Sequence, residues 1–124
     1  MDKEIDIDIK KIIKVANEYF SKKGRTEKFV KLEDTIIATK DAEYIYDFAK
    51  NIKGADIEKL TDAIIDTKVI GCIYDFARFI KGANINKLTD AIIAAKKAYY
   101  IYYFAFIKGA DVSKLTNALI ATKN

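Results

Sequence analysis

The chain has 124 residues, of which 51% are hydrophobic and 32% are charged, and its formal net charge at pH 7 is +4. This length has room for one domain with one continuous core, and the mild positive charge permits an anionic partner without requiring one. The longest uncharged apolar run, residues 98–107, is too short to cross a bilayer, and residues 1–4 lack the pattern of a signal peptide. We therefore expect a cytoplasmic protein that makes no membrane contact.

The N-terminal stretch carries two conflicting periods. Isoleucines alternate with aspartates over residues 5–9, which is typical of a strand. Apolar residues also follow a helical spacing there, at Ile5, Ile9, Ile12, Ala16 and Phe20. We predict a helix, because a lone strand would find no second strand to pair with elsewhere in the chain.

The rest of the chain is an internal repeat with a period of 28 residues. Segments 41–68, 69–96 and 97–123 align along their whole length, and the last has lost one residue just before its Ile-Lys-Gly turn. Segment 13–40 is a degenerate copy whose second half still matches the others. We expect a single domain over residues 1–124, in which residues 1–12 begin the first helix.

Each unit contains two short runs of helical period. In segment 41–68, Tyr44 and Phe48 belong to the first run, and Leu60 and Ile64 belong to the second. Helices this short are marginal alone and need each other's apolar faces. The sequence therefore predicts an all-α fold, a short α-solenoid of four stacked helix–turn–helix repeats.

Glycine and a short polar residue separate the two helices of each unit. Gly54, Gly82 and Gly109 are predicted to adopt the left-handed conformation that follows a helix. Two residues later, each unit has a residue that is well suited to cap the next helix, namely Asp56, Asn84 and Asp111.

The units resemble known helical repeats. Their IYDFAK, IKGA and KLTDAII segments are similar to repeats of uncharacterised proteins from low-GC bacteria, and the hairpins resemble HEAT-type α-solenoids with a shorter period. The resemblance covers residues 13–123. It implies a fold and no activity, and by fold-level analogy it implies a binding surface.

The side chains that most enzyme and metal sites need are scarce. There is no histidine, and the single cysteine, Cys72, has no histidine to activate it, so we interpret it as a small buried hydrophobic residue. One cysteine cannot supply a zinc site. No glycine-rich phosphate-binding motif occurs. We predict no enzyme activity, no metal and no cofactor.

The last unit has aromatic residues in slots that are polar in the other units. Tyr99 and Tyr103 stand where the earlier copies have Glu43 or Gly71, and Asp47 or Asp75. Tyrosine is enriched in interface hot spots. We therefore predict that the protein is a non-enzymatic binding module, for example a small phage or mobile-element inhibitor of a larger host machine. The predicted contact residues are Tyr99, Tyr103, Phe106 and Tyr102.

Two alternatives to this hetero-interface stay open at this stage. The same residues could join two copies of the chain as a homodimer. The rings could also simply fold over the exposed end of the stack.

A lysine ladder offers a second interpretation, nucleic-acid binding. One slot near the start of each second helix is lysine in all four units, at Lys31, Lys59, Lys87 and Lys114. Such a ladder could contact phosphates. However, an aspartate three residues later is expected to neutralise the first three lysines within their own helices, and only Lys114 faces a neutral residue, Asn117.

Overall fold

The computed structural model describes residues 8–123 of the chain. This part consists of eight α-helices without a strand, which confirms the predicted all-α class. None of these helices combines the length and the hydropathy that crossing a membrane would require. The helices are α1 (Ile9–Lys23), α2 (Glu27–Ala38), α3 (Ala42–Asn51), α4 (Ile57–Thr67), α5 (Ile70–Phe79), α6 (Ile85–Ala95), α7 (Ala98–Phe104) and α8 (Val112–Ala121).

The predicted N-terminal helix begins at Ile9, where the Asp8 side chain accepts a hydrogen bond from the backbone N–H of Lys11. Ile5, and the alternating pattern around it, lie outside the described residues.

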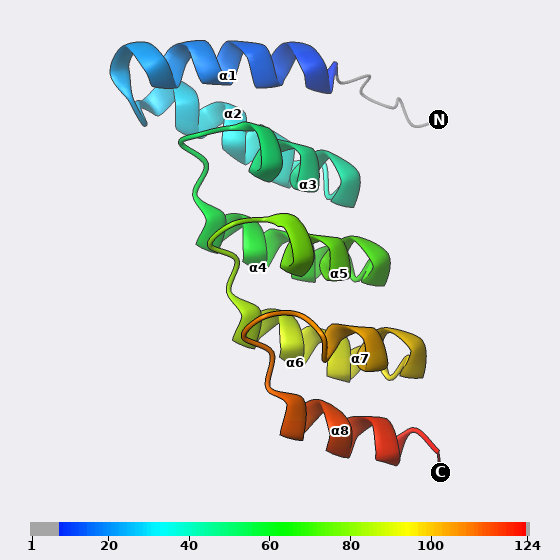
Figure 1. Cartoon of the computed structure of the whole chain (residues 1–124). Coiled ribbons are helices and arrows are strands. Elements are labelled where there is room, and N and C mark those ends of the chain that lie inside the picture. The colour runs from blue at the N-terminus through cyan, green and yellow to red at the C-terminus, as the bar shows by residue number, and fades with distance from the viewer. Residues whose placement is uncertain (1–7, 124) are drawn as a thin grey trace, which may run out of the picture.

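Consecutive helices form four hairpins that stack in one direction (Figure 1). The odd-numbered helices lie side by side in one layer, and the even-numbered helices form a second layer behind them (Figure 1). The first hairpin, α1 and α2, is at one end of the stack, and the fourth hairpin, α7 and α8, is at the other. The arrangement is that of the predicted solenoid.

The capping predictions for the second helices are confirmed. Asp56, Asn84 and Asp111 each accept a hydrogen bond from a backbone N–H three residues later, at 3.0 Å. This satisfies one of the free N–H groups that open a helix.

The glycine prediction is confirmed at two of the three positions. Gly82 and Gly109 have φ values of 86° and 89°, a region that favours glycine. The prediction is wrong for Gly54, whose φ is not positive. A Cβ atom there would lie 2.2 Å from the ring of Phe20, so the close approach of α1 requires this glycine.

The short connections between hairpins have their own construction. Lys40, Lys68 and Lys96 end the second helices in the left-handed region, with φ near 58°. Before two of them, threonine hydroxyls bridge the turn. Thr67, for example, donates to the Ile64 carbonyl at 2.7 Å and accepts from the Val69 N–H at 3.2 Å. Such side-chain bonds hold the backbone in a tight turn between two helices.

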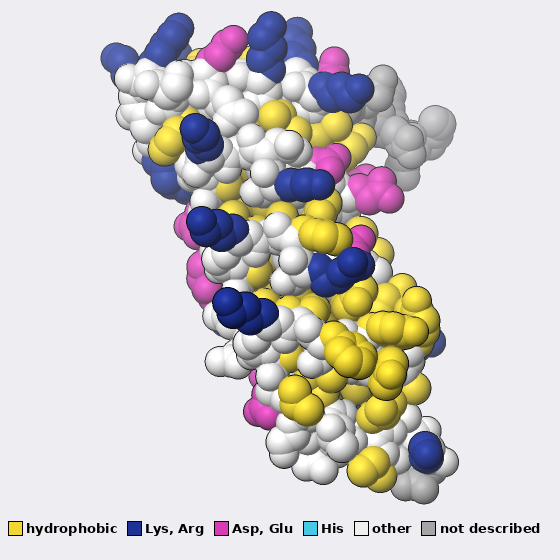
Figure 2. Space-filling model, in the orientation of Figure 1, with side chains coloured by type: hydrophobic (Ala, Val, Ile, Leu, Met, Phe, Trp, Pro, Cys, Tyr) yellow, Lys and Arg dark blue, Asp and Glu magenta, His cyan; other side chains and the backbone are white. Residues whose placement is uncertain are grey.

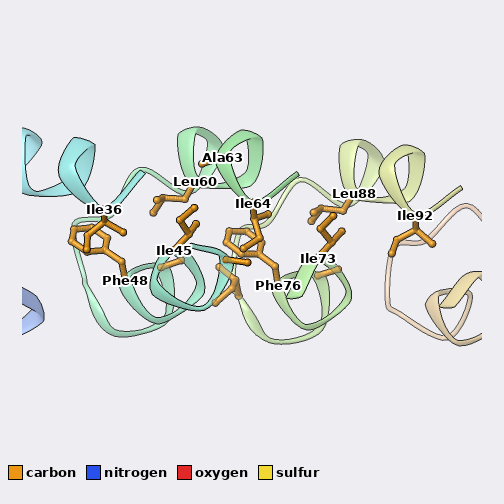
Figure 3. Close-up of a cluster of buried hydrophobic side chains, with 14 of the residues drawn as sticks. Ile36, Ile45, Phe48, Leu60, Ala63, Ile64, Ile73, Phe76, Leu88 and Ile92 are labelled. Atoms are coloured by element: carbon orange, nitrogen blue, oxygen red, sulfur yellow. The ribbon is translucent and has the colours of Figure 1, made fainter. Parts of the chain in front are cut away.

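The core runs the length of the stack, between the two layers (Figure 3). Each hairpin contributes one phenylalanine that is fully buried: Phe29, Phe48, Phe76 and Phe104. In the middle of the stack, isoleucine and leucine side chains from both layers gather around Phe48 and Phe76 (Figure 3). Burying side chains of this size stabilises the fold by about 1.5–3 kcal/mol each, which helices this short require.

The residue that the last unit lacks is absorbed by shortening a helix. Helices α3 and α5 each have ten residues, whereas α7 has seven and ends at Phe104. The chain then continues in tight turns, in which the Phe106 N–H bonds to the Tyr103 carbonyl at 3.1 Å. The last hairpin therefore keeps its place in the stack, while Phe106 lies beyond the helix end.

Candidate functional site

Each odd-numbered helix has one face that looks toward the next hairpin. The Tyr74 ring of α5 lies 5.8 Å from the Tyr100 ring and 6.4 Å from the Phe104 ring of α7. A Cβ atom at Gly71 would come within 3.4 Å of the Tyr100 hydroxyl. Gly71 and Tyr74 thus face the next hairpin, and Asp75 and Arg78 lie on the same side of α5 at the spacing i, i+3, i+4 and i+7; we call these four positions the stacking stripe.

The equivalent stripe of α3 faces α5 in the same way, because Glu43 and Asp47 of this stripe lie close enough to Cys72 of α5 to act on its thiol. Burial raises the pKa of the Cys72 thiol, and the negative charges of Glu43, Asp75, Asp41 and Asp47 raise it further. The prediction that Cys72 is buried is met only in part, because the side chain is partly buried and packs against the edge of the core. Its raised pKa leaves the thiol protonated.

On α7 and the turn that follows it, the stacking stripe consists of the four predicted contact residues, Tyr99, Tyr102, Tyr103 and Phe106, and we call it the aromatic stripe. No hairpin follows α7 and α8 within the described part of the chain, so this stripe is open to solvent. The four side chains are 66%, 49%, 42% and 71% exposed, in that order. Figure 2 shows the resulting hydrophobic area over α5 and α7, in contrast to the lysine-rich surface over α1.

The four rings form one continuous cluster. The ring centroids of Tyr99 and Tyr103 are 4.9 Å apart, and those of Tyr102 and Phe106 are 5.4 Å apart. Tyr102 and Tyr103 join the two pairs, with their centroids 5.0 Å apart. The structure therefore brings together all four residues that the sequence singled out.

The inner stripes cover their tyrosines with charged groups. The Arg78 guanidinium lies 5.0 Å from the ring centre of Tyr74 and 3.6 Å from the Asp75 carboxylate. On α3, the Lys50 ammonium lies 5.7 Å from the Tyr46 ring. In the aromatic stripe, Tyr103 and Phe106 stand at the positions of this aspartate and this basic residue, so neither charge is present.

The last hairpin thus ends the stack with an apolar surface. On α8, Val112 and Ile120 are 54% and 59% exposed, whereas their equivalents in the inner hairpins are partly buried. Solenoids normally end in a capping repeat with a polar outer face. The exposed rings do not fold inward to make such a cap.

The lysine ladder forms ion pairs between hairpins, so the prediction of pairing within one helix is wrong. Each lysine that follows the first reaches the aspartate of the preceding hairpin: Lys59 reaches Asp34 at 2.6 Å, Lys87 reaches Asp62 at 2.9 Å and Lys114 reaches Asp90 at 2.6 Å. Lys114, which was expected to lack an acid, has one. The spacing within a single helix cannot reveal these partners, because stacking brings together residues about 25 positions apart.

In these ion pairs the lysine ammonium groups, which a phosphate would have to bind, already contact carboxylates. Three of the lysines donate hydrogen bonds to carboxylates, and these bonds raise the pKa of each ammonium group. The main acceptor is Asp34 for Lys59, Glu58 followed by Asp62 for Lys87, and Asp90 for Lys114. Conversely, Lys87 and then Asn84 lower the pKa of Glu58. Within residues 8–123, Lys31 is the ladder lysine without an ion pair. This geometry does not favour the nucleic-acid interpretation.

A buried carboxylate in the first hairpin was missed by the sequence analysis. Glu33 is fully buried and forms a bidentate pair with Arg25, at 2.9 and 3.1 Å. It also accepts from the Lys59 ammonium at 3.2 Å and from the Asp56 N–H at 2.9 Å. Since every one of these donors belongs to the stack itself, the network joins the first two hairpins. The signal was the glutamate in a slot that holds Thr61 in the next unit.

Comparison of the chain with models of known protein families, with curated proteins and with solved structures gives no match.

Proposed function

We propose that this protein is a non-enzymatic binding module that holds another polypeptide chain on its aromatic stripe. The observation that carries the proposal is the exposure of four adjacent rings on a face where the inner hairpins carry an acid and a base beside a single tyrosine. A contiguous exposed apolar patch often marks an interaction site.

The size and chemistry of the stripe support protein binding. At roughly 200 Å² for each aromatic side chain, the exposed fractions correspond to roughly 450 Å² of contiguous surface. The largest apolar patches of monomeric proteins have about this size and are often functional. Tyrosine also loses little conformational entropy on binding, and it is enriched among the residues that dominate binding energy.

The proposal is tested by placing a photo-crosslinking phenylalanine analogue at Tyr99 and irradiating cells that encode the chain. We expect covalent protein adducts, because the side chain at this position would lie inside the interface. The matched control carries the analogue at Phe79, a 53% exposed aromatic residue of α5 that lies beside Lys53 and Ala55 of the preceding hairpin.

Specificity is tested with Tyr103→Asp, which restores the residue type of the inner hairpins and should reduce the adducts at position 99. If no adduct forms at position 99, or if the control position gives the same adducts, the aromatic stripe is not a protein-binding site.

A further inference from the structure

We infer that the occupant of the aromatic stripe is a second copy of this chain, joined end to end about a two-fold axis. In this dimer α7 packs antiparallel on α7 of the second copy. The inference rests on the proposed function, since it uses the same stripe and names what covers it.

The end face is built like the inner junctions. Ile85, at the start of α6, lies 3.9 Å from the place where a Cβ of Gly109 would be, so this slot contacts the turn of the next hairpin. Ile93 lines a depression together with Ala118 and Thr122, so this second slot looks toward the next even-numbered helix. Their equivalents in the last hairpin are Val112 and Ile120, which together with the aromatic stripe form a face shaped to receive another layer of helices.

Charge argues against covering this face with the opposite end of a second copy. At every inner junction a lysine of the later hairpin binds a carboxylate of the earlier one. The last hairpin has Asn117 in the slot of Asp90, and Ser113 in the slot of Glu58. A head-to-tail contact would bring Lys31 to this face without a carboxylate to receive it, so the stack does not continue into an open filament.

Two identical C-terminal ends are compatible with each other. In a two-fold contact each surface meets its own copy, so a charged centre would place like charges together. The aromatic stripe carries no charge. A two-fold axis that lies in the plane of the end face and runs across the helices, from one layer to the other, also keeps odd-numbered helices on odd-numbered helices.

The area is sufficient for a specific dimer. Two aromatic stripes would bury roughly 900 Å² of ring surface in total. Val112 and Ile120 bring the total above the roughly 1,000 Å² that a specific interface needs. This is at the low end of the range, so we expect a reversible dimer.

The charges around the end face predict how this dimer responds to salt. Residues 97–124 contain four lysines and one aspartate, which gives a net charge of +3. Lys97, Lys108 and Lys123 are exposed and have no described ion pair. Two such ends repel each other, and salt screens this repulsion. Association should therefore tighten as the salt concentration rises, whereas a contact held by ion pairs would weaken.

Sedimentation equilibrium of the full chain, from micromolar to millimolar concentration at low and high salt, tests the inference. We expect a monomer–dimer equilibrium without larger species, and a lower dissociation constant at high salt. Tyr99→Glu combined with Tyr103→Asp should raise the dissociation constant by at least about 100-fold, because each change acts twice in a two-fold interface. Tyr99→Ser combined with Phe106→Ser, which adds no charge, should act in the same direction.

The control is Phe79→Glu, an exposed aromatic residue that faces the preceding hairpin and should leave the dimer intact. Circular dichroism melting identifies variants that fail to fold. A wild type that stays monomeric, a series of larger oligomers, association that weakens with salt, or a folded double variant that still dimerises would each overturn the inference. A monomer that forms adducts to another protein at position 99 overturns the dimer alone, whereas a monomer without adducts overturns the proposed function as well.

Discussion

At the scale of single residues, equivalent slots of the repeat perform different tasks. Gly82 provides a left-handed backbone, whereas Gly54 makes room for the Phe20 ring. Thr61 donates its hydroxyl to a carbonyl of its own helix, whereas Glu33 in the same slot accepts from Arg25 of its own hairpin and from Asp56 and Lys59 of the next. The surroundings that stacking creates therefore decide what each side chain does.

Glu33 and Asp34 allow this dependence on surroundings to be measured, because both bind the Lys59 ammonium, at 3.2 and 2.6 Å. Glu33 is fully buried, while the side chain of Asp34 is 55% exposed. We expect Glu33→Gln to lower the free energy of unfolding by about 2 kcal/mol, since a neutral amide at this buried position takes the carboxylate away from Arg25 and Lys59, whose side chains are each 33% exposed. Asp34→Asn should cost less than about 1 kcal/mol, although its distance is shorter. Urea unfolding of both variants checks this, and equal losses would contradict it.

At the scale of helices, the starts of the odd-numbered helices differ within the repeat. Asp41 caps α3 by accepting from the N–H groups of Glu43 and Tyr44, at 3.0 and 3.1 Å. Val69 and Lys97 occupy the same slot before α5 and α7 and offer no side-chain cap. Helices α5 and α7 thus depend more on packing than α3 does.

Val69→Asp should stabilise the protein by about 1 kcal/mol, because it supplies the missing cap. The backbone is already suitable, since φ and ψ are −88° and 97° at Val69, against −93° and 112° at Asp41. Val69 is 46% exposed, so the carboxylate keeps contact with water. Thermal melting should show a rise of about 4 °C for a chain of this size. Val69→Ala is the control, and an equal rise there would rule out capping as the cause.

At the scale of the whole molecule, the two ends of the stack differ in kind. The surface over α1 is rich in lysine, while the last hairpin presents the aromatic stripe with Val112 and Ile120 (Figure 2). The junctions between hairpins repeat the same contacts, and each can support another layer. A hairpin could therefore be added within the stack without changing the residues that are exposed at its end.

Inserting a second copy of residues 69–96 after residue 96 should lengthen the stack by one hairpin. The inserted Lys87 equivalent would meet Asp90, and the inserted Phe76 equivalent would join the core, as at the existing junctions. We expect the melting temperature to rise, because each added repeat contributes an interface. The dimer should persist, because the aromatic stripe remains at the end. A matched insert with its Phe76 equivalent changed to Asp should lower the melting temperature, and a lower value for both inserts would contradict the junction geometry.

The periodic apolar pattern was sufficient to predict an all-α stack of hairpins and the caps of the second helices, because these depend on contacts within about 30 residues. It also singled out the aromatic stripe, since Tyr99 and Tyr103 break the pattern of the repeat. Only the tertiary structure showed that Lys114 binds Asp90, that Glu33 is buried and that the stripe is a stacking face. These features depend on which side chains of successive hairpins meet, and a one-dimensional period does not specify that geometry.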